Sequence, residues 1–180
     1  KNLNSKILGK GKETLIILHG LFGSLDNWYT IAKELACDFQ VHILDQRNHG
    51  KSFHHQIHNY DVMSNDLLEY ISFYKIKKPI VLGHSMGGKT GMSFALTYQE
   101  KLSKLIVLDI APKKYIHNHS TIINILLEID DLEIDSRKKA EDMFRNNNID
   151  NPTIQFLLKN LFWTNNKKLK FRFNLNSIKS

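Results

Sequence analysis

Continuous apolar runs alternate with amphipathic segments along the first part of the chain. The runs occupy residues 14–18, 41–45, 79–82 and 105–109, and each leads into a polar or glycine-containing loop. Runs of this length with no internal alternation are typical of strands that are buried on both faces. We therefore expect four parallel strands, each followed by a loop at the same edge of one sheet.

The segments between these runs have the spacing of amphipathic helices. In residues 26–35 the apolar side chains share one face, and Asp26 or Asn27 is the expected cap. Residues 61–74 repeat the pattern behind Asp61, and residues 89–99 contain no proline. Strands that alternate with helices predict an α/β fold, with a mostly parallel sheet and flanking helices.

The pattern changes after Pro112. Residues 121–129, 136–145 and 153–160 have helical spacing, and no strand is expected between them. We expect residues 1–112 to form the α/β core and residues 113–180 to form a separate helical region.

Composition narrows the class of protein. The chain has 180 residues, and its hydrophobic fraction of 42% is ordinary for a globular domain. No apolar run approaches the roughly 18 residues that a membrane span needs, and the N-terminus lacks the apolar stretch of a secretory signal. Cys37 is the single cysteine, which excludes an internal disulfide. We expect a cytoplasmic protein with no membrane span.

The net charge of +7 comes mostly from lysines that are spread along the chain, so we expect no nucleic-acid partner. The densest basic segment, residues 167–172, alternates with aromatic residues. The same alternation fits an amphipathic strand equally well.

The segment GHSMGGKT, residues 83–90, matches two motifs at once. As G-x-S-x-G it is the nucleophile elbow of a serine hydrolase, with Ser85 at its centre. As G-x-x-x-x-G-K-T it is a phosphate-binding loop, in which Lys89 would contact the phosphates. The apolar run that ends at Asp109 would then resemble a magnesium-binding strand. Either motif requires a strand before it and a helix after it.

The hydrolase interpretation accounts for more of the sequence. A nucleophilic serine on a sharp turn needs small residues two positions before and after it, and Gly83 and Gly87 meet this need. The loops HGLFGS, residues 19–24, and DQRNHGKS, residues 45–52, follow other strands at the same edge. We expect His19 and His49 to orient backbone through hydrogen bonds. For Arg47 we expect hydrogen bonds that anchor its loop to backbone carbonyls, in preference to contact with an anionic substrate.

Together, HGLFGS, DQRNHGKS, GHSMGGK and LDIAP, in this order and spacing, resemble the α/β-hydrolase superfamily, in particular the small bacterial esterases of the YbfF type. The resemblance implies a helical cap at residues 113–180 and hydrolysis of a small-molecule acyl ester or thioester through an acyl-serine. It implies Ser85 as nucleophile and Asp109 as the acid of the triad. It also implies an oxyanion hole of backbone N–H groups from Leu21, Phe22 and Met86, with no cofactor and no metal.

A histidine base is the missing member of this triad. Members of the family carry it near the C-terminus, whereas the last histidines here are His117 and His119. We expect the base beyond residue 180, on a longer polypeptide. Three alternatives stay open, namely a base at His117 or His119, a catalytically dead scaffold, and a P-loop-like nucleotide-binding protein. We expect the group His54, His55 and His58 to form a solvated loop without a metal.

Overall fold

The computed structural model describes residues 2–113 and 120–179. The chain forms two compact units, residues 1–113 and 114–180. Each unit buries apolar side chains of its own, such as Ile16 and Val81 in the first and Leu126 and Ile154 in the second.

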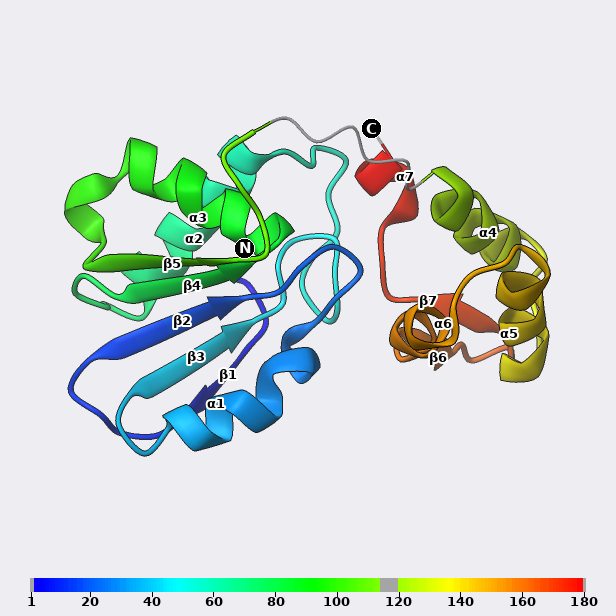
Figure 1. The fold of residues 1–180 in the computed structure, drawn as a ribbon, viewed down its shortest axis with the longest axis horizontal. Coiled ribbons are helices and arrows are strands. Elements are labelled where there is room, and N and C mark those ends of the chain that lie inside the picture. Colours follow the sequence, from blue (N-terminus) through cyan, green and yellow to red (C-terminus); the bar gives the residue numbers. More distant parts are fainter. Residues whose placement is uncertain (1, 114–119, 180) are drawn as a thin grey trace. The chain divides into compact units, whose positions relative to one another are not determined.

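The first unit is built on a five-stranded sheet, ordered β1-β3-β2-β4-β5 (Figure 1). Its strands are β1 (Ser5–Leu8), β2 (Thr14–Leu18), β3 (Gln40–Leu44), β4 (Ile80–His84) and β5 (Lys104–Leu108). The strands β3, β2, β4 and β5 run parallel to one another, and β1 pairs antiparallel with β3 at one edge. The predicted α/β fold is confirmed. The edge strand β1 was not expected, because four residues carry too short a pattern.

Helices cover both faces of this sheet (Figure 1). On one face lie α2 (Tyr60–Phe73) and α3 (Met86–Thr97), and on the other lies α1 (Tyr29–Leu35) after the 3-10 turn η1 (Leu25–Trp28). A second 3-10 turn, η2 (Gln99–Lys101), precedes β5. Alternate strand residues serve the two faces: Ile16 and Leu18 pack in the cluster with α2 and α3, whereas Leu15 and Ile17 pack in the cluster with α1.

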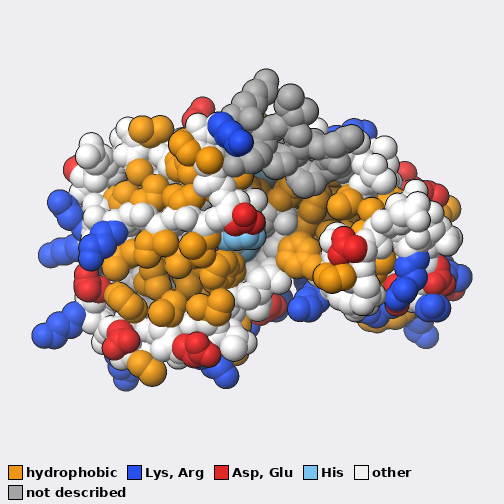
Figure 2. Space-filling view, viewed as in Figure 1, with side chains coloured by type: hydrophobic (Ala, Val, Ile, Leu, Met, Phe, Trp, Pro, Cys, Tyr) orange, Lys and Arg blue, Asp and Glu red, His pale blue; other side chains and the backbone are white. Residues whose placement is uncertain are grey.

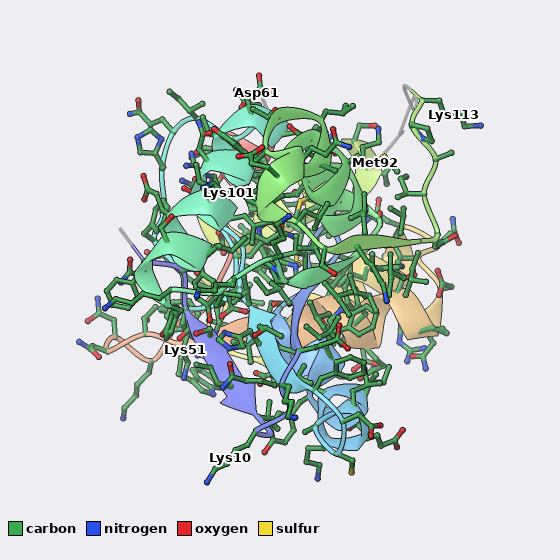
Figure 3. The ribbon with its side chains drawn as sticks, turned by 90° about the vertical axis from the view of Figure 1, so that its left-hand side faces the viewer. Lys10, Lys51, Asp61, Met92, Lys101 and Lys113 are labelled. Carbon is green, nitrogen blue, oxygen red and sulfur yellow. The ribbon has the colours of Figure 1, made fainter. Side chains whose placement is uncertain are left out.

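Two predicted helix caps are wrong. The turn η1 begins after Ser24, whose N–H donates to the Asn27 side chain (2.7 Å), so neither Asp26 nor Asn27 is the first cap. In α2 the cap is Asn59, whose Oδ1 accepts the N–H of Val62 (3.0 Å). Asp61 instead lies in the first turn and projects outward (Figure 3). Ser24 and Asn59 both lie before the first apolar residue of the helical repeat, so the spacing of apolar residues does not identify them.

The second unit contains more than helices. Its helices are α4 (Ser120–Asp131), α5 (Arg137–Asn146), α6 (Asn151–Leu158) and α7 (Leu175–Lys179). Between α6 and α7 the strands β6 (Leu161–Trp163) and β7 (Leu169–Phe171) form an antiparallel pair. The region expected to be helical therefore also contains one short strand pair, which follows the three expected helices. Leu169 and Phe171 are buried while Lys170 is exposed, so the basic–aromatic alternation is that of an amphipathic strand.

Charged and apolar side chains are distributed differently on the first unit. The lysines Lys10, Lys51, Lys101 and Lys113 project in different directions and form no single patch (Figure 3). Hydrophobic side chains, by contrast, gather over the visible face of the sheet (Figure 2). At the edge strand β5, Ile106 is 41% exposed and Leu108 is 38% exposed. None of the helices within the described ranges has the length and hydropathy of a membrane span.

Candidate active site

Ser85 occupies a strained turn between β4 and α3. Its φ of 50° and ψ of −113° belong to a region that residues with a Cβ rarely adopt, and it is the cap residue before Met86, the first residue of α3. The N–H of Ser85 donates to the carbonyl of Leu108 on the neighbouring strand (3.0 Å), which holds the turn against β5. Strain of this kind costs on the order of 1–3 kcal/mol and is maintained only where the surrounding structure imposes it.

Two glycines make this turn sterically feasible. An added Cβ at Gly83 would overlap the carbonyl oxygen of Gly87 and lie 2.6 Å from the N atom of Gly88. An added Cβ at Gly87 would overlap the carbonyl oxygen of Leu18 and lie 2.7 Å from that of His19. These are backbone atoms that cannot move aside, so both positions exclude any side chain. The G-x-S-x-G spacing therefore has a direct steric cause.

The loop after β2 lies beside the serine. An added Cβ at Gly20 would lie 3.4 Å from the Cβ of Ser85, so the chain at Gly20 and Leu21 passes next to the nucleophile position. Phe22 follows with a φ of 58°, which turns the chain sharply. Its N–H donates to Nε2 of His49 (3.3 Å). Met86, on the other side of Ser85, begins a helix whose first N–H groups have no partner within the helix.

The loop after β3 supports the loop after β2. The carboxylate of Asp45 accepts the N–H groups of Leu25 (2.7 Å) and Lys51 (2.9 Å). The side chain of Gln46 donates to the carbonyl of His19 (2.7 Å) and accepts the hydroxyl of Thr90 on α3 (2.9 Å). Three segments that are distant in sequence are thus joined around the elbow by buried polar side chains.

His19 and His49 are buried in this network, as expected for residues that orient backbone. His19 Nε2 accepts the N–H of Gln46 (3.0 Å), and its Nδ1 lies 2.8 Å from the carbonyl of Gly20. Burial lowers the pKa of both His19 and His49. Desolvation disfavours the charged imidazolium, so both rings are neutral near pH 7.

Arg47 anchors the loop after β3 to α2. Its guanidinium donates to the carbonyls of Ile57 (2.9 Å) and Val62 (3.4 Å), as expected, and also to both carboxylate oxygens of Asp66. Sequence reasoning missed Asp66. The signal was present, because Asp66 is a charged residue on the apolar face of α2, next to Leu67 and Met63, and such a residue requires a buried partner.

Asp109 lies directly after β5 at the same edge of the sheet as Ser85. Its φ is 54°, and its side chain is 88% exposed. The carboxylate faces the ring of His84, with Nε2 and Oδ2 3.7 Å apart. His84 packs beside the elbow as expected, because an added Cβ at Gly20 would lie 2.9 Å from its Nδ1. The structure thus brings Ser85, Asp109 and the loop containing Leu21 and Phe22 to one edge of the sheet.

The residues of the phosphate-loop motif are otherwise engaged. The Nζ atom of Lys89 donates to the carbonyl of Lys113 (3.0 Å) and lies 5.7 Å from the centre of the Tyr60 ring. Thr90, which would bind magnesium in such a loop, is 1% exposed, and its hydroxyl donates to Gln46 and to Met86 O. These contacts disfavour the nucleotide-binding alternative.

The other histidines do not form a metal centre in the described part of the chain. His54 and His55 are exposed, whereas His58 is half-buried, with its ring centre 5.8 Å from that of His49. Residues 2–113 and 120–179 contain no group of three or more histidine, cysteine or carboxylate side chains placed to hold a metal ion. His117 and His119 lie outside the described residues.

Comparisons with known proteins agree on one fold. A family model described as the alpha/beta hydrolase fold matches residues 13–154. Esterase YbfF of Escherichia coli is 35% identical over 81% of this chain and 58% of its own length. The sn-1-specific diacylglycerol lipase ABHD11 of Danio rerio is 38% identical over 94% of this chain and 56% of its own length.

A solved structure is similar over almost the whole chain. The structure of a marine microorganism esterase is 42% identical, with a TM-score of 0.94, over 99% of this chain and 70% of the esterase. The chain thus spans a little more than half the length of the curated relatives named above.

Proposed function

The chain belongs to the α/β-hydrolase fold family, as its motifs predicted, and on this premise we propose that the protein is a serine esterase or thioesterase. It hydrolyses small-molecule acyl esters or thioesters through an acyl-serine intermediate. The relatives support this class, because one is named an esterase and another a diacylglycerol lipase. The chain length of the acyl group depends on the cap, which we assign to residues 113–180.

The conformation of Ser85 is the observation that carries the proposal. A serine at φ 50° and ψ −113°, between a strand and a helix, has its side chain lifted out of the turn. The backbone strain has no structural benefit there, because glycine would adopt the same angles without it. Strained residues with a reactive side chain are concentrated at active sites, so the strain favours a nucleophile over an ordinary turn residue.

The proposed reaction begins with attack of the Ser85 hydroxyl oxygen on the ester carbonyl carbon. A base takes the hydroxyl proton, and the carbonyl oxygen becomes an oxyanion that accepts N–H groups of Met86 and the loop at Leu21. The intermediate collapses to acyl-Ser85, and the alcohol or thiol leaves with the proton from the base. Water then attacks the acyl group by the same steps and releases the acid.

We propose a histidine outside the described residues as the base, with Asp109 orienting it. His19 and His49 are unsuitable, because both ring nitrogens of each are engaged by backbone groups. The carboxylate of Asp109 is exposed at the same edge as Ser85, which leaves it accessible to such a histidine. An Asp after the strand that follows the elbow agrees with the order serine, acid, histidine in this fold.

Labelling with a fluorophosphonate tests the nucleophile directly. The full natural chain and the 180-residue chain are each treated, and the adduct is measured by intact mass, with Ser85→Ala as the test variant. Ser93→Ala, on the same helix, is the matched control. We expect an adduct on the natural chain that Ser85→Ala abolishes and Ser93→Ala retains.

The same experiment separates the alternatives for the base. If only a longer natural chain reacts, the base lies beyond residue 180. If the 180-residue chain reacts as well, His117 and His119 are mutated next. If neither chain forms an adduct and neither hydrolyses esters, the result would instead support a catalytically dead scaffold.

A further inference from the structure

Two buried histidines connect the loop after β2 to the loop after β3 by an exchange of hydrogen bonds. His19, on the first loop, accepts the N–H of Gln46 on the second (3.0 Å). His49, on the second loop, accepts the N–H of Phe22 on the first (3.3 Å). We call these four residues the histidine clasp. Each loop therefore supplies one acceptor ring and one donor amide.

The second nitrogen of each ring determines which tautomer is present. Nδ1 of His49 lies 2.9 Å from the carbonyl of Arg47, and Nδ1 of His19 lies 2.8 Å from the carbonyl of Gly20. A carbonyl oxygen only accepts, so both Nδ1 atoms must carry the hydrogen. Both Nε2 atoms are then free of hydrogen, and they accept backbone N–H groups only while the rings are neutral.

From this geometry we propose that His49 is a positioning residue of the oxyanion hole. By accepting the N–H of Phe22 it directs this amide away from the hole, which leaves Leu21 as the donor from the loop after β2. The inference rests on the proposed esterase function. It also removes Phe22 from the set of oxyanion donors that the sequence suggested.

The surroundings of Leu21 support this assignment. Leu21 lies between Gly20, which is packed against Ser85 and His84, and Phe22, which is held by His49. Oxyanion donors act because they are oriented before the charge develops, so a donor needs neighbours that cannot rotate. The clasp constrains the residue after Leu21, and the contact with the elbow constrains the residue before it.

The clasp is also joined to the helix that follows the nucleophile. Gln46 donates its N–H to His19, and its side chain accepts the hydroxyl of Thr90 on α3. The same hydroxyl lies 3.2 Å from the carbonyl of Met86, whose N–H is the other proposed oxyanion donor. The two sides of the hole are thus connected through buried side chains.

Protonation would open the clasp. A hydrogen on Nε2 of His49 would point at the Phe22 N–H, so the acceptor would be lost. The titratable groups that face His49 are the rings of His19, His54 and His58, and those that face His19 also include Asp45 and His84. From Arg47, it is the backbone carbonyl that contacts His49. Burial and the neighbouring histidines lower the pKa of His49 below its usual value. The clasp is therefore intact near neutral pH and is lost as the pH falls through that lowered pKa.

Two substitutions in the full natural chain separate positioning from mere support. His49→Gln can keep an acceptor near the position of Nε2 but does not titrate, whereas His49→Leu removes the acceptor. His55→Gln, a change in the same segment at an exposed histidine, is the matched control. The measurement is kcat/KM for an activated ester and for its thiono analogue, whose C=S sulfur is a weak hydrogen-bond acceptor, each as a function of pH.

We expect His49→Leu to lower kcat/KM for the oxo ester by about tenfold to a hundredfold, less than the roughly 100- to 1,000-fold loss of a whole oxyanion donor. The thiono ester should lose much less, because it depends little on the oxyanion donors. His49→Gln should stay within about threefold of the wild type and lose part of the acid limb of the pH profile. His55→Gln should change neither.

Equal losses for the oxo and thiono esters would overturn the proposal and leave His49 a supporting role. If His49→Leu instead raises the ratio of kcat/KM for the oxo ester to kcat/KM for the thiono ester, then the released N–H of Phe22 is the better oxyanion donor. This result would also overturn the proposal. If the wild type neither hydrolyses esters nor labels at Ser85, the proposed function fails, and so does the catalytic consequence. In that case NMR of the His49 ring nitrogens still tests the clasp by itself. A hydrogen on Nε2 at neutral pH would show that Nε2 does not accept the Phe22 N–H.

Discussion

The guanidinium of Arg47 donates two hydrogen bonds to the carboxylate of Asp66, from Nε to Oδ2 (2.5 Å) and from Nη2 to Oδ1 (2.7 Å). Both side chains are less than a tenth exposed. A bidentate pair of this kind fixes the direction of both side chains as well as their distance. It fastens the loop after β3, which carries Gln46 and His49 of the histidine clasp, to the middle of α2.

Breaking this pair is expected to destabilise the first unit strongly. Asp66→Ala should lower the free energy of unfolding by about 3–5 kcal/mol, because it leaves the Arg47 charge buried without a partner. Urea unfolding followed by the fluorescence of Trp28, in a chain with Trp163 replaced by phenylalanine, measures this value. The double variant Arg47→Met, Asp66→Leu should recover much of the loss, and a loss below about 1 kcal/mol in Asp66→Ala would contradict the role of the pair.

Relief of strain at Ser85 should be measurable. Alanine at position 85 keeps the strain of φ 50° and ψ −113°, whereas glycine adopts these angles freely. Ser85→Gly should therefore be more stable than Ser85→Ala by about 1–2 kcal/mol in the same urea experiment. The order should reverse at Ser93 in the interior of α3, where glycine costs about 1 kcal/mol relative to alanine. Equal stability of the two position-85 variants would mean that the turn is relaxed.

Gly87 and Gly91 offer a matched comparison within α3. An added Cβ at Gly87 meets backbone atoms of Leu18 and His19, but at Gly91 its nearest contact is Cδ1 of Leu105, the end of a side chain that can turn. Gly87→Ala should lower the free energy of unfolding by about 1–3 kcal/mol. It should also abolish labelling of Ser85.

Gly91→Ala should instead stay within about 1 kcal/mol of the wild type and retain labelling, because alanine is the better helix former. If labelling survives in Gly87→Ala, the close approach of β2 to the elbow is not required for a reactive serine.

Acid should destabilise the first unit partly through His42. This ring is buried beneath α2, with its Nδ1 2.8 Å from the hydroxyl of Tyr70, and burial lowers its pKa to about 4. The folded state thus holds the neutral ring, and the unfolded state takes up a proton below pH 6.5. His42 therefore contributes stability that is complete above pH 6.5 and is lost as the pH falls towards 4.

The free energy of unfolding, measured from pH 7 to pH 4, checks this contribution. Between about pH 6 and pH 4.5, its slope against pH should be lower in His42→Phe than in the wild type by up to about 1.4 kcal/mol per pH unit, the value for one proton. His42→Gln should show the same lower slope, because glutamine does not titrate, although unlike phenylalanine it can form a hydrogen bond with the Tyr70 hydroxyl. An unchanged slope in both variants would show that His42 takes up its proton in the folded state.

The sequence by itself determined the features that depend on neighbouring residues. The apolar runs at residues 14–18, 41–45, 79–82 and 105–109 correspond to parallel strands within two residues at each end. The glycines at 83 and 87 indicated a crowded turn, because their spacing around Ser85 is a local requirement. The order of the motif-bearing loops resembled that of the α/β-hydrolase family. It could be used without a structure, because parallel strands bring the loops that follow them to one edge of the sheet.

Only the tertiary structure decided the features whose partners are distant in the chain. The pairing of β1 with β3, the ion pair of Arg47 with Asp66, and the hydrogen bonds of His19 to Gln46 and of His49 to Phe22 all join residues that lie 19 or more positions apart. The strand β6 was not expected, because three residues carry almost no periodic signal, whereas the alternation at residues 167–172 had left a strand there as one of two interpretations. A polar residue on an apolar face of the sequence pattern indicates that a buried partner is needed. Which residue is that partner depends on the fold, because packing sets the distance and direction between side chains.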